Sequence, residues 1–154
     1  MREAILAVET EVDAPVAGVR DWFLSLEEYP ERYAFETHQG FEFAEGGFGE
    51  PGARFSTRET FFFLKLRLRF ELEAVEDRAF SFRLMRPACL KIWGQFGIEE
   101  AMEGRSVVGL RIGSETRLGQ ILLRFYPIAA AIHRQICGEL GNIRASIEGA
   151  SDSP

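Results

Sequence analysis

The sequence predicts an α+β domain in which a curved, seven-stranded antiparallel sheet wraps around one long C-terminal helix. Seven segments alternate between apolar and polar residues, two short helical patterns separate the first strand from the second, and a long helical pattern follows the last strand. The chain has 154 residues, enough for one core that buries roughly two-thirds of the unfolded surface. Residues 1–148 are therefore expected to form a single domain.

The first strand is predicted over residues 3–13, where apolar side chains alternate with glutamates. Pro15 fits the first position of a helix. Apolar residues at helical spacing extend this helix to about Glu27, and a second short helix is expected over residues 30–33. Both helices thus lie between strands one and two.

The second strand is predicted over residues 37–45, and a glycine-rich turn follows it at residues 46–52. The third strand is predicted over residues 53–62. Alternation along the third strand places four side chains on one face: Phe55, Thr57, Glu59 and Phe61.

The alternation of apolar and polar residues continues through residues 66–76 without a glycine or proline. A single strand over residues 53–76 would be about 80 Å long at roughly 3.3 Å per residue, several times the usual length. A hairpin near residues 62–65 is therefore expected, with Phe62 or Phe63 at its tip. An exposed phenylalanine there would favour a homodimer or a surface that faces a membrane.

Three further strands are predicted, each ended by a turn signal. The fifth covers residues 80–84 after the turn at Asp77 and Arg78, the sixth covers residues 90–98, and the seventh covers residues 108–112. The sixth is less regular because Trp93 is in the opposite register to its other apolar residues.

The final helix is predicted over residues 118–148, with its apolar side chains in a stripe about 80° wide. Pro127 should kink this helix or mark its effective start, because proline removes a backbone donor. Residues 149–154 are polar and are expected to form a disordered tail. The stripe contains Leu118, Leu122, Phe125, Ala129, Ile132, Ile136, Leu140, Ile143 and Ile147.

Composition excludes several classes of function. The net charge of -6 argues against nucleic acid as a main partner, because phosphate binding needs a basic surface. The two cysteines, Cys89 and Cys137, show no paired spacing and are expected to be buried, reduced thiols. No metal site and no cofactor are expected, since the two histidines have no acidic partner at metal spacing.

The sequence also predicts a cytoplasmic protein that is not an integral membrane protein. The N-terminus leads directly into an alternating strand rather than into the apolar stretch of a signal peptide. The longest apolar stretch, residues 118–136, is interrupted by polar and charged residues.

With this order of elements, several short sequence segments resemble those of the START/SRPBCC superfamily, whose members share the helix-grip fold. The resemblance covers nearly the whole chain and implies an internal cavity between sheet and helix. The superfamily includes ligand carriers, hormone receptors, polyketide cyclases, dehydratases and coenzyme-Q-binding proteins, so the fold does not select among these functions. No catalytic motif can be transferred position by position. The matching segments are residues 12–15 with the following Val19 and Trp22, residues 26–30, residues 51–55 at the start of a strand, and residues 140–147.

The predicted registers give the cavity an apolar lining with few polar groups. The chain has 14 phenylalanines, which add bulk without a polar atom and suit either a dense core or a cavity wall. The expected lining consists of Phe41, Phe43, Phe55, Phe61, Leu68, Phe70, Phe82, Phe96, Leu110 and the stripe of the helix, which includes Ala129.

Glu59 is the least expected residue of this lining, because a buried carboxylate costs several kcal/mol unless it is paired or protonated. One interpretation makes it an acid–base group or a hydrogen-bond acceptor for a ligand. The other places it on an edge strand, where it reaches water.

His133 lies on the flank of the helical stripe, one turn after Ala129. It is either a core or rim histidine bonded to the backbone, or a proton-transfer group of the cavity. Tyr126 is on the same flank. It is either a hydrogen-bond donor to a ligand carbonyl or a core ring with one solvent-exposed edge.

Trp22 and Trp93 are expected to be packing residues, with ligand stacking as the alternative. His38 is expected to be exposed because it is in the register opposite to Phe41 and Phe43. The outward faces of strands three to five are rich in cations. They form either a solvated face interleaved with glutamates or a basic patch for a protein, an anionic lipid surface or a charged carrier domain. These cations are Arg54, Arg58, Lys65, Arg67, Arg69 and Arg83.

Three functions follow from these observations. The primary hypothesis is binding of a small hydrophobic or lipid-like ligand in the cavity. The alternative is a cyclase or dehydratase that acts by acid–base catalysis through Glu59 or His133, so the sequence does not decide whether the protein is an enzyme. The third is an interaction module that uses the basic outer face.

Overall fold

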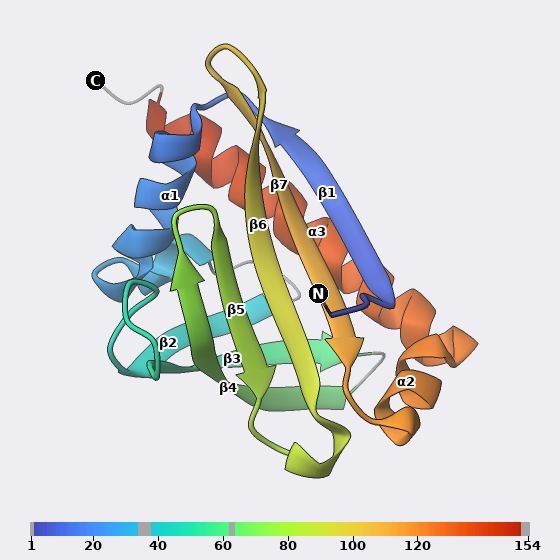
Figure 1. Ribbon diagram of the computed structural model, residues 1–154. Coiled ribbons are helices and arrows are strands. Elements are labelled where there is room, and N and C mark those ends of the chain that lie inside the picture. The colour runs from blue at the N-terminus through green and yellow to red at the C-terminus, as the bar shows by residue number, and fades with distance from the viewer. Residues whose placement is uncertain (1, 34–37, 62–63, 152–154) are drawn as a thin grey trace.

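The computed structural model describes residues 2–33, 38–61 and 64–151. It has the predicted architecture: one seven-stranded antiparallel sheet in the order β1-β7-β6-β5-β4-β3-β2, curved around a long C-terminal helix (Figure 1). The strands are β1 (Leu6–Val12), β2 (His38–Glu45), β3 (Arg54–Phe61), β4 (Leu64–Glu76), β5 (Ala79–Leu84), β6 (Ile92–Met102) and β7 (Arg105–Ser114).

Short helices lie between strands one and two, as predicted, but they form three segments instead of two because the first predicted helix is divided into α1 and η1. Helix α1 (Val16–Leu24) and the short 3-10 helices η1 (Ser25–Glu27) and η2 (Pro30–Tyr33) connect β1 to β2. A third 3-10 helix, η3 (Ala88–Leu90), lies between β5 and β6. The hairpin predicted near residues 62–65 is confirmed, because β3 ends at Phe61, β4 begins at Leu64, and the two residues pair. Phe62 and Phe63 lie outside the described residues.

The C-terminal helix is two helices, α2 (Arg117–Arg124) and α3 (Tyr126–Ser151). Phe125 between them has an extended backbone, with φ -65° and ψ 120°. Pro127 cannot donate to the preceding turn, so it is placed in the first turn of a new helix instead of inside a continuous one. Of the two predicted outcomes for Pro127, the structure therefore has the second.

The break at Phe125 changes which side chains are buried. Leu118 and Phe125 belong to the predicted stripe, but they are 63% and 59% exposed, because α2 does not share its axis with α3. At the other end, α3 continues to Ser151, so residues 149–151, predicted as part of a tail, are helical. Residues 152–154 lie outside the described part.

An aromatic cluster fills one half of the concave side of the sheet. The Phe23 ring on α1 lies 5.2 Å from the Phe80 ring and 5.0 Å from the Phe96 ring, measured between centroids. Phe48, from the loop between β2 and β3, packs against Phe23 and is 1% exposed. Because α1 closes this half of the sheet, the space between sheet and helices remains only in the other half.

The outer face of the sheet is solvated and carries ion pairs. Arg54 and Arg83 both bond Glu71, at 3.2 and 3.0 Å, and Arg67 bonds Glu42 at 3.0 Å. The guanidinium of Arg83 lowers the pKa of Glu71. Part of the predicted basic patch is therefore neutralised by neighbouring glutamates.

The two cysteines are not buried as predicted. Cys89 lies in η3 and Cys137 on the outer side of α3, and both are exposed. None of the described helices is both long and apolar enough to cross a membrane.

Candidate functional site

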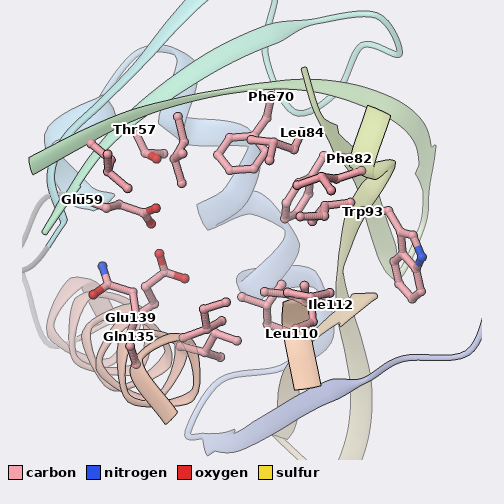
Figure 2. Close-up of a pocket in the computed structure, with 18 of the residues that line it drawn as sticks. Thr57, Glu59, Phe70, Phe82, Leu84, Trp93, Leu110, Ile112, Gln135 and Glu139 are labelled. Carbon is pink, nitrogen blue, oxygen red and sulfur yellow. The ribbon is translucent and has the colours of Figure 1, made fainter. Parts of the chain in front are cut away.

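A cavity of about 520 Å³ lies between the concave face of the sheet and the helices α2 and α3. Strands β3 to β7 supply one wall, and the inward face of α3 supplies the other (Figure 2). The aromatic part of the wall is a chain of touching rings: Phe55 stacks on Phe70 at 5.2 Å, and Phe82 contacts both Phe70 and Phe96. Most of the cavity surface is therefore apolar.

Polar side chains gather at one end of this cavity. Thr57 and Glu59 come from β3, and Gln135 and Glu139 come from α3. All four are buried, with exposed fractions of 3% to 7%. Figure 2 shows the Glu59 and Glu139 carboxylates pointing toward each other across the space, with Trp93 at the opposite end. The cavity thus has one polar end and one apolar end.

Tyr33 of η2 also lines the polar end. Burial raises the pKa of its phenol well above the ordinary value, and the negative charges of Glu139 and Glu59 raise it further. Its hydroxyl donates a hydrogen bond to Glu139. Tyr33 is therefore a fixed, neutral donor that orients one carboxylate.

The Thr57 hydroxyl differs from the other polar groups at this end of the cavity in its hydrogen bonding. Thr57 Oγ1 is buried, and it has no hydrogen-bond partner among the described residues. A buried hydroxyl without a partner costs about 1–3 kcal/mol. The cavity therefore holds a polar atom whose hydrogen-bonding capacity is unused.

Alternation along β3 explains why these groups point inward. Successive side chains of a strand point to opposite faces, so Phe55, Thr57 and Glu59 share the concave face. Strand β3 is paired on both sides, with β2 and with β4. The interpretation of Glu59 as a solvated residue of an edge strand is therefore wrong, because Glu59 is buried inside the sheet.

The structure brings many of the predicted cavity residues together. Phe43 packs against Phe48 at 5.3 Å and Phe55 at 5.8 Å and does not line the cavity. The side chains of Phe41, Phe61 and His38 lie outside the described part of the structure. The predicted residues that do line the cavity include Phe55, Glu59, Leu68, Phe70, Phe82, Phe96 and Leu110.

Three predicted residues of the C-terminal helix are not placed at the cavity. Tyr126 is 80% exposed, Ala129 is half-buried beside the lining, and His133 is exposed with its Nδ1 3.7 Å from Cys137 Sγ. The inward face of α3 passes through Ile128, Ile132 and Ile136, the last two of which belong to the predicted stripe. Tyr126, Ala129 and His133 lie beside this face or away from it. His133 is therefore corrected from a cavity candidate to a surface residue.

Sequence reasoning missed Gln135 and Glu139. Each lies three residues after an isoleucine of the apolar stripe, Ile132 and Ile136, so both fall on the same face of α3. A polar residue inside an otherwise apolar stripe was the available signal. Among the described residues, no cluster of three histidine, cysteine or acidic side chains is placed to hold a metal ion.

The lining residues that are also exposed mark the mouth of the cavity. These are Leu64 and Leu66 at the start of β4 and Pro87 between β5 and β6. Leu122 of α2 and Ile128 of α3 lie at partly exposed positions of the same lining. The mouth is therefore bounded by the start of β4, the β5–β6 connection, α2 and the start of α3.

No protein-family model and no curated protein sequence matches the chain. Solved structures do match it over nearly its full length. TTHA0849 from Thermus thermophilus is 16% identical, with a TM-score of 0.74, and the match covers 96% of this chain and 99% of that one. The Zhui aromatase/cyclase from Streptomyces sp. R1128 is 11% identical, with a TM-score of 0.71 and coverage of 96% and 95%.

Ara h 8.0201 is 14% identical, with a TM-score of 0.67 and coverage of 94% of this chain and 97% of that one. At these identities the likeness concerns the fold. It confirms the predicted resemblance at that level: the chain has the helix-grip fold.

Proposed function

We propose that this protein binds a small, largely apolar molecule in the cavity, with a polar group of the ligand at the end formed by Thr57, Glu59 and Glu139. The volume of about 520 Å³ lies within the range of roughly 300–1,000 Å³ typical of small-molecule sites. Burial of apolar ligand surface would supply most of the affinity, at about 25 cal/mol per Å² before the costs of association.

The observation that carries this proposal is the Thr57 hydroxyl. It is buried in the wall of an apolar cavity and has no hydrogen-bond partner among the described residues. A ligand with a polar group at this end would form the missing bond. Carboxyl oxygens accept hydrogen bonds, so Glu59 and Glu139 suit a ligand group that donates, such as a hydroxyl or an amide N–H.

Native mass spectrometry of the purified protein, followed by denaturing extraction, tests for a co-purified ligand. A bound molecule with an apolar body and one donor group is the expected result. A second arm uses added ligands: 1-decanol and decane, each titrated by calorimetry. Decanol should bind more tightly than decane, and the difference should shrink in Glu59→Gln and Glu139→Gln.

Glu103→Gln is the matched control for the titration, because Glu103 lies on the exposed turn between β6 and β7. It should leave both affinities unchanged. Equal affinities of the wild type for decanol and decane would contradict the role given to the polar end.

A second candidate function is acid–base catalysis on a ketone substrate, as in a cyclase or dehydratase. The specific observation in its favour is the pair of buried carboxylates, Glu59 and Glu139, which face each other in a largely apolar cavity (Figure 2). Such a pair can remove a proton from carbon on one side and return a proton on the other. His133 takes no part in this version, because it is exposed.

Exchange of the α-protons of an aryl ketone in D₂O, followed by NMR, tests this second candidate. The wild type should accelerate the exchange, and Glu59→Gln and Glu139→Gln should each abolish most of the acceleration. Exchange at the uncatalysed rate in wild-type protein would leave ligand binding as the only proposal.

A further inference from the structure

Exposed apolar side chains are concentrated around the mouth of the cavity. Leu64 and Leu66 at the start of β4 are 54% and 41% exposed. On and just after α2, Ile121 is 60% exposed and Tyr126 is 80% exposed, together with Leu118 and Phe125. Six of the eight large apolar side chains that are exposed in the described part of the chain lie at this one end.

Helix α2 presents one apolar face outward. Leu118, Ile121, Leu122 and Phe125 follow the i, i+3, i+4, i+7 spacing of a single helical face. Gly119 and Leu123 on the other side are buried against the rest of the protein, and Thr116 caps the helix by accepting a bond from the Gly119 amide at 3.1 Å. The helix is thus fixed in place while Leu118, Ile121 and Phe125 of its apolar face stay exposed, and Leu122 of the same face lines the cavity.

Three segments of the chain around the mouth are basic, although the protein as a whole is acidic; Glu115, just before α2, is exposed but pairs with Arg2. The segments 64–70, 85–91 and 117–134 contain eight Lys and Arg residues and none of the 24 acidic residues of the chain. Within the described part of the chain, Arg67 is the only one of the eight that forms an ion pair, with Glu42. The eight are Lys65, Arg67, Arg69, Arg86, Lys91, Arg117, Arg124 and Arg134.

We propose that this end of the protein, the basic apolar rim, docks on the surface of an anionic phospholipid membrane. The rim is defined by the exposed apolar side chains of β4 and α2 and by these eight cations. Apolar side chains of an interfacial helix enter the boundary between headgroups and acyl chains, while Lys and Arg contact the anionic headgroups. Each cation near such a surface contributes about 1 kcal/mol, roughly a fivefold change in partitioning.

The charge of the rim also favours a membrane over a second copy of the protein as its partner. A two-fold dimer through this rim would bring the cations of one copy against the same cations of the other, which is unfavourable. A membrane with negative headgroups complements both the charge and the apolar face. The mouth would then open toward the acyl chains, so an apolar ligand could pass between membrane and cavity without crossing water. Docking itself does not depend on the cavity being occupied.

Co-sedimentation with vesicles tests this proposal. Wild-type protein should bind vesicles of phosphatidylcholine and phosphatidylglycerol mixed 3:1, and bind pure phosphatidylcholine vesicles at least tenfold more weakly. The double variant Ile121→Ser and Phe125→Ser removes apolar contacts, and Lys65→Glu and Lys91→Glu reverses two charges. Each pair should weaken binding to the mixed vesicles at least tenfold, while circular dichroism shows an unchanged fold.

Matched controls lie at the other end of the sheet (Figure 1). Met102 is 60% exposed at the β6–β7 turn, and Arg78 is exposed at the β4–β5 turn. Met102→Ser and Arg78→Glu should leave vesicle binding within twofold of wild type. Equal losses in the controls, or no binding of wild type to the mixed vesicles, would overturn the proposal.

Two further outcomes would overturn it in favour of another occupant. Dimerisation that is lost in the Ile121→Ser, Phe125→Ser variant, without vesicle binding, would make the rim an interface between copies. Binding to poly-glutamate that is lost in the Lys65→Glu, Lys91→Glu variant, again without vesicle binding, would indicate an acidic protein.

Discussion

Phe82 and Gly94 are cross-strand partners on β5 and β6, and the Phe82 ring lies directly over the Gly94 α-carbon. A Cβ atom placed on Gly94 would overlap this ring. The ring contacts Phe55, Phe70 and Phe96 around it and forms part of the cavity wall. The absence of a side chain at Gly94 therefore sets the position of a ring that shapes the cavity.

Gly94→Ala should lower the free energy of unfolding by about 1–3 kcal/mol, the usual cost of overpacking a core. It should also weaken binding of an apolar probe such as 1-anilinonaphthalene-8-sulfonate, because the displaced ring can move only into the cavity or into its aromatic neighbours. Urea denaturation and a fluorescence titration measure the two effects.

Gly97→Ala is the matched control on the same strand, since nothing lies within 4 Å of a Cβ built there. It should be neutral or slightly stabilising, because glycine inside a strand costs conformational entropy. Equal effects of the two substitutions would contradict the steric explanation.

Thr57→Val should separate stability from binding. Valine keeps the shape of threonine and removes the hydroxyl that has no partner among the described residues. The free energy of unfolding of the ligand-free protein should therefore stay unchanged or rise by up to about 1 kcal/mol. The affinity for decanol should fall, while that for decane should not, in calorimetric titrations.

Thr116→Val makes the same chemical change at a position where the threonine hydroxyl forms hydrogen bonds. Thr116 Oγ1 accepts from the Gly119 amide at 3.1 Å and donates to the Leu90 carbonyl at 3.0 Å. Loss of this cap should cost about 1–2 kcal/mol of stability. If Thr57→Val destabilises as much as Thr116→Val, the Thr57 hydroxyl has a structural partner and its proposed role fails.

Most of the fold could be predicted from local patterns. Alternation and turn residues locate the strands, and the limit on strand length locates the hairpin between Phe61 and Leu64 even without a glycine. The break at Phe125 was harder, because the apolar spacing continues across it and only Pro127 signals it. Phe48 lies in a loop whose sequence has no period, so its burial follows only from packing against Phe23 and Phe55.

The candidate site was predictable only in part, because a strand and a helix meet there. Glu59 was identified from its register within β3, which is local information. Glu139 and Tyr33 reach the same end from α3 and η2, and their proximity depends on how these elements dock. The stripe after the break is buried or partly buried as predicted, from Ile132 to Ile147, but His133 was placed on its flank, and the sequence does not show that this flank faces away from the cavity.

The Trp22 indole joins the first helix to the last. Its Nε1 donates to Ser146 Oγ at 2.9 Å, across 124 residues of sequence. Ser146→Ala should lower the free energy of unfolding by about 1–3 kcal/mol, because it leaves a buried N–H without a partner. In the Trp22→Phe background the same substitution should cost far less. A double-mutant cycle from urea denaturation gives the coupling energy, and additive costs would exclude the bond as its source.

Glu148 provides a test of stability against pH at the junction of β1 and α3. The Asp13 backbone amide donates to Glu148 Oε1 at 3.0 Å, and Arg144 Nε donates to the same oxygen at 3.2 Å. The bond from Asp13 lowers the pKa of Glu148 below its ordinary value of 4.5, and Arg144 lowers it further. The carboxylate therefore adds stability above pH 4.5 that is lost as the pH falls through the lowered pKa.

Glu148→Gln should consequently destabilise the protein at pH 7, and the difference from wild type should shrink steadily as the pH falls below 4.5. Urea denaturation at a series of pH values measures this difference. The Arg144→Gln background removes the weaker of the two partners, so most of the pH-dependent difference should remain there. A difference that is constant with pH would mean that the charge of Glu148 does not hold the junction, whereas one that vanishes with Arg144→Gln would assign the effect to the ion pair instead of the Asp13 amide.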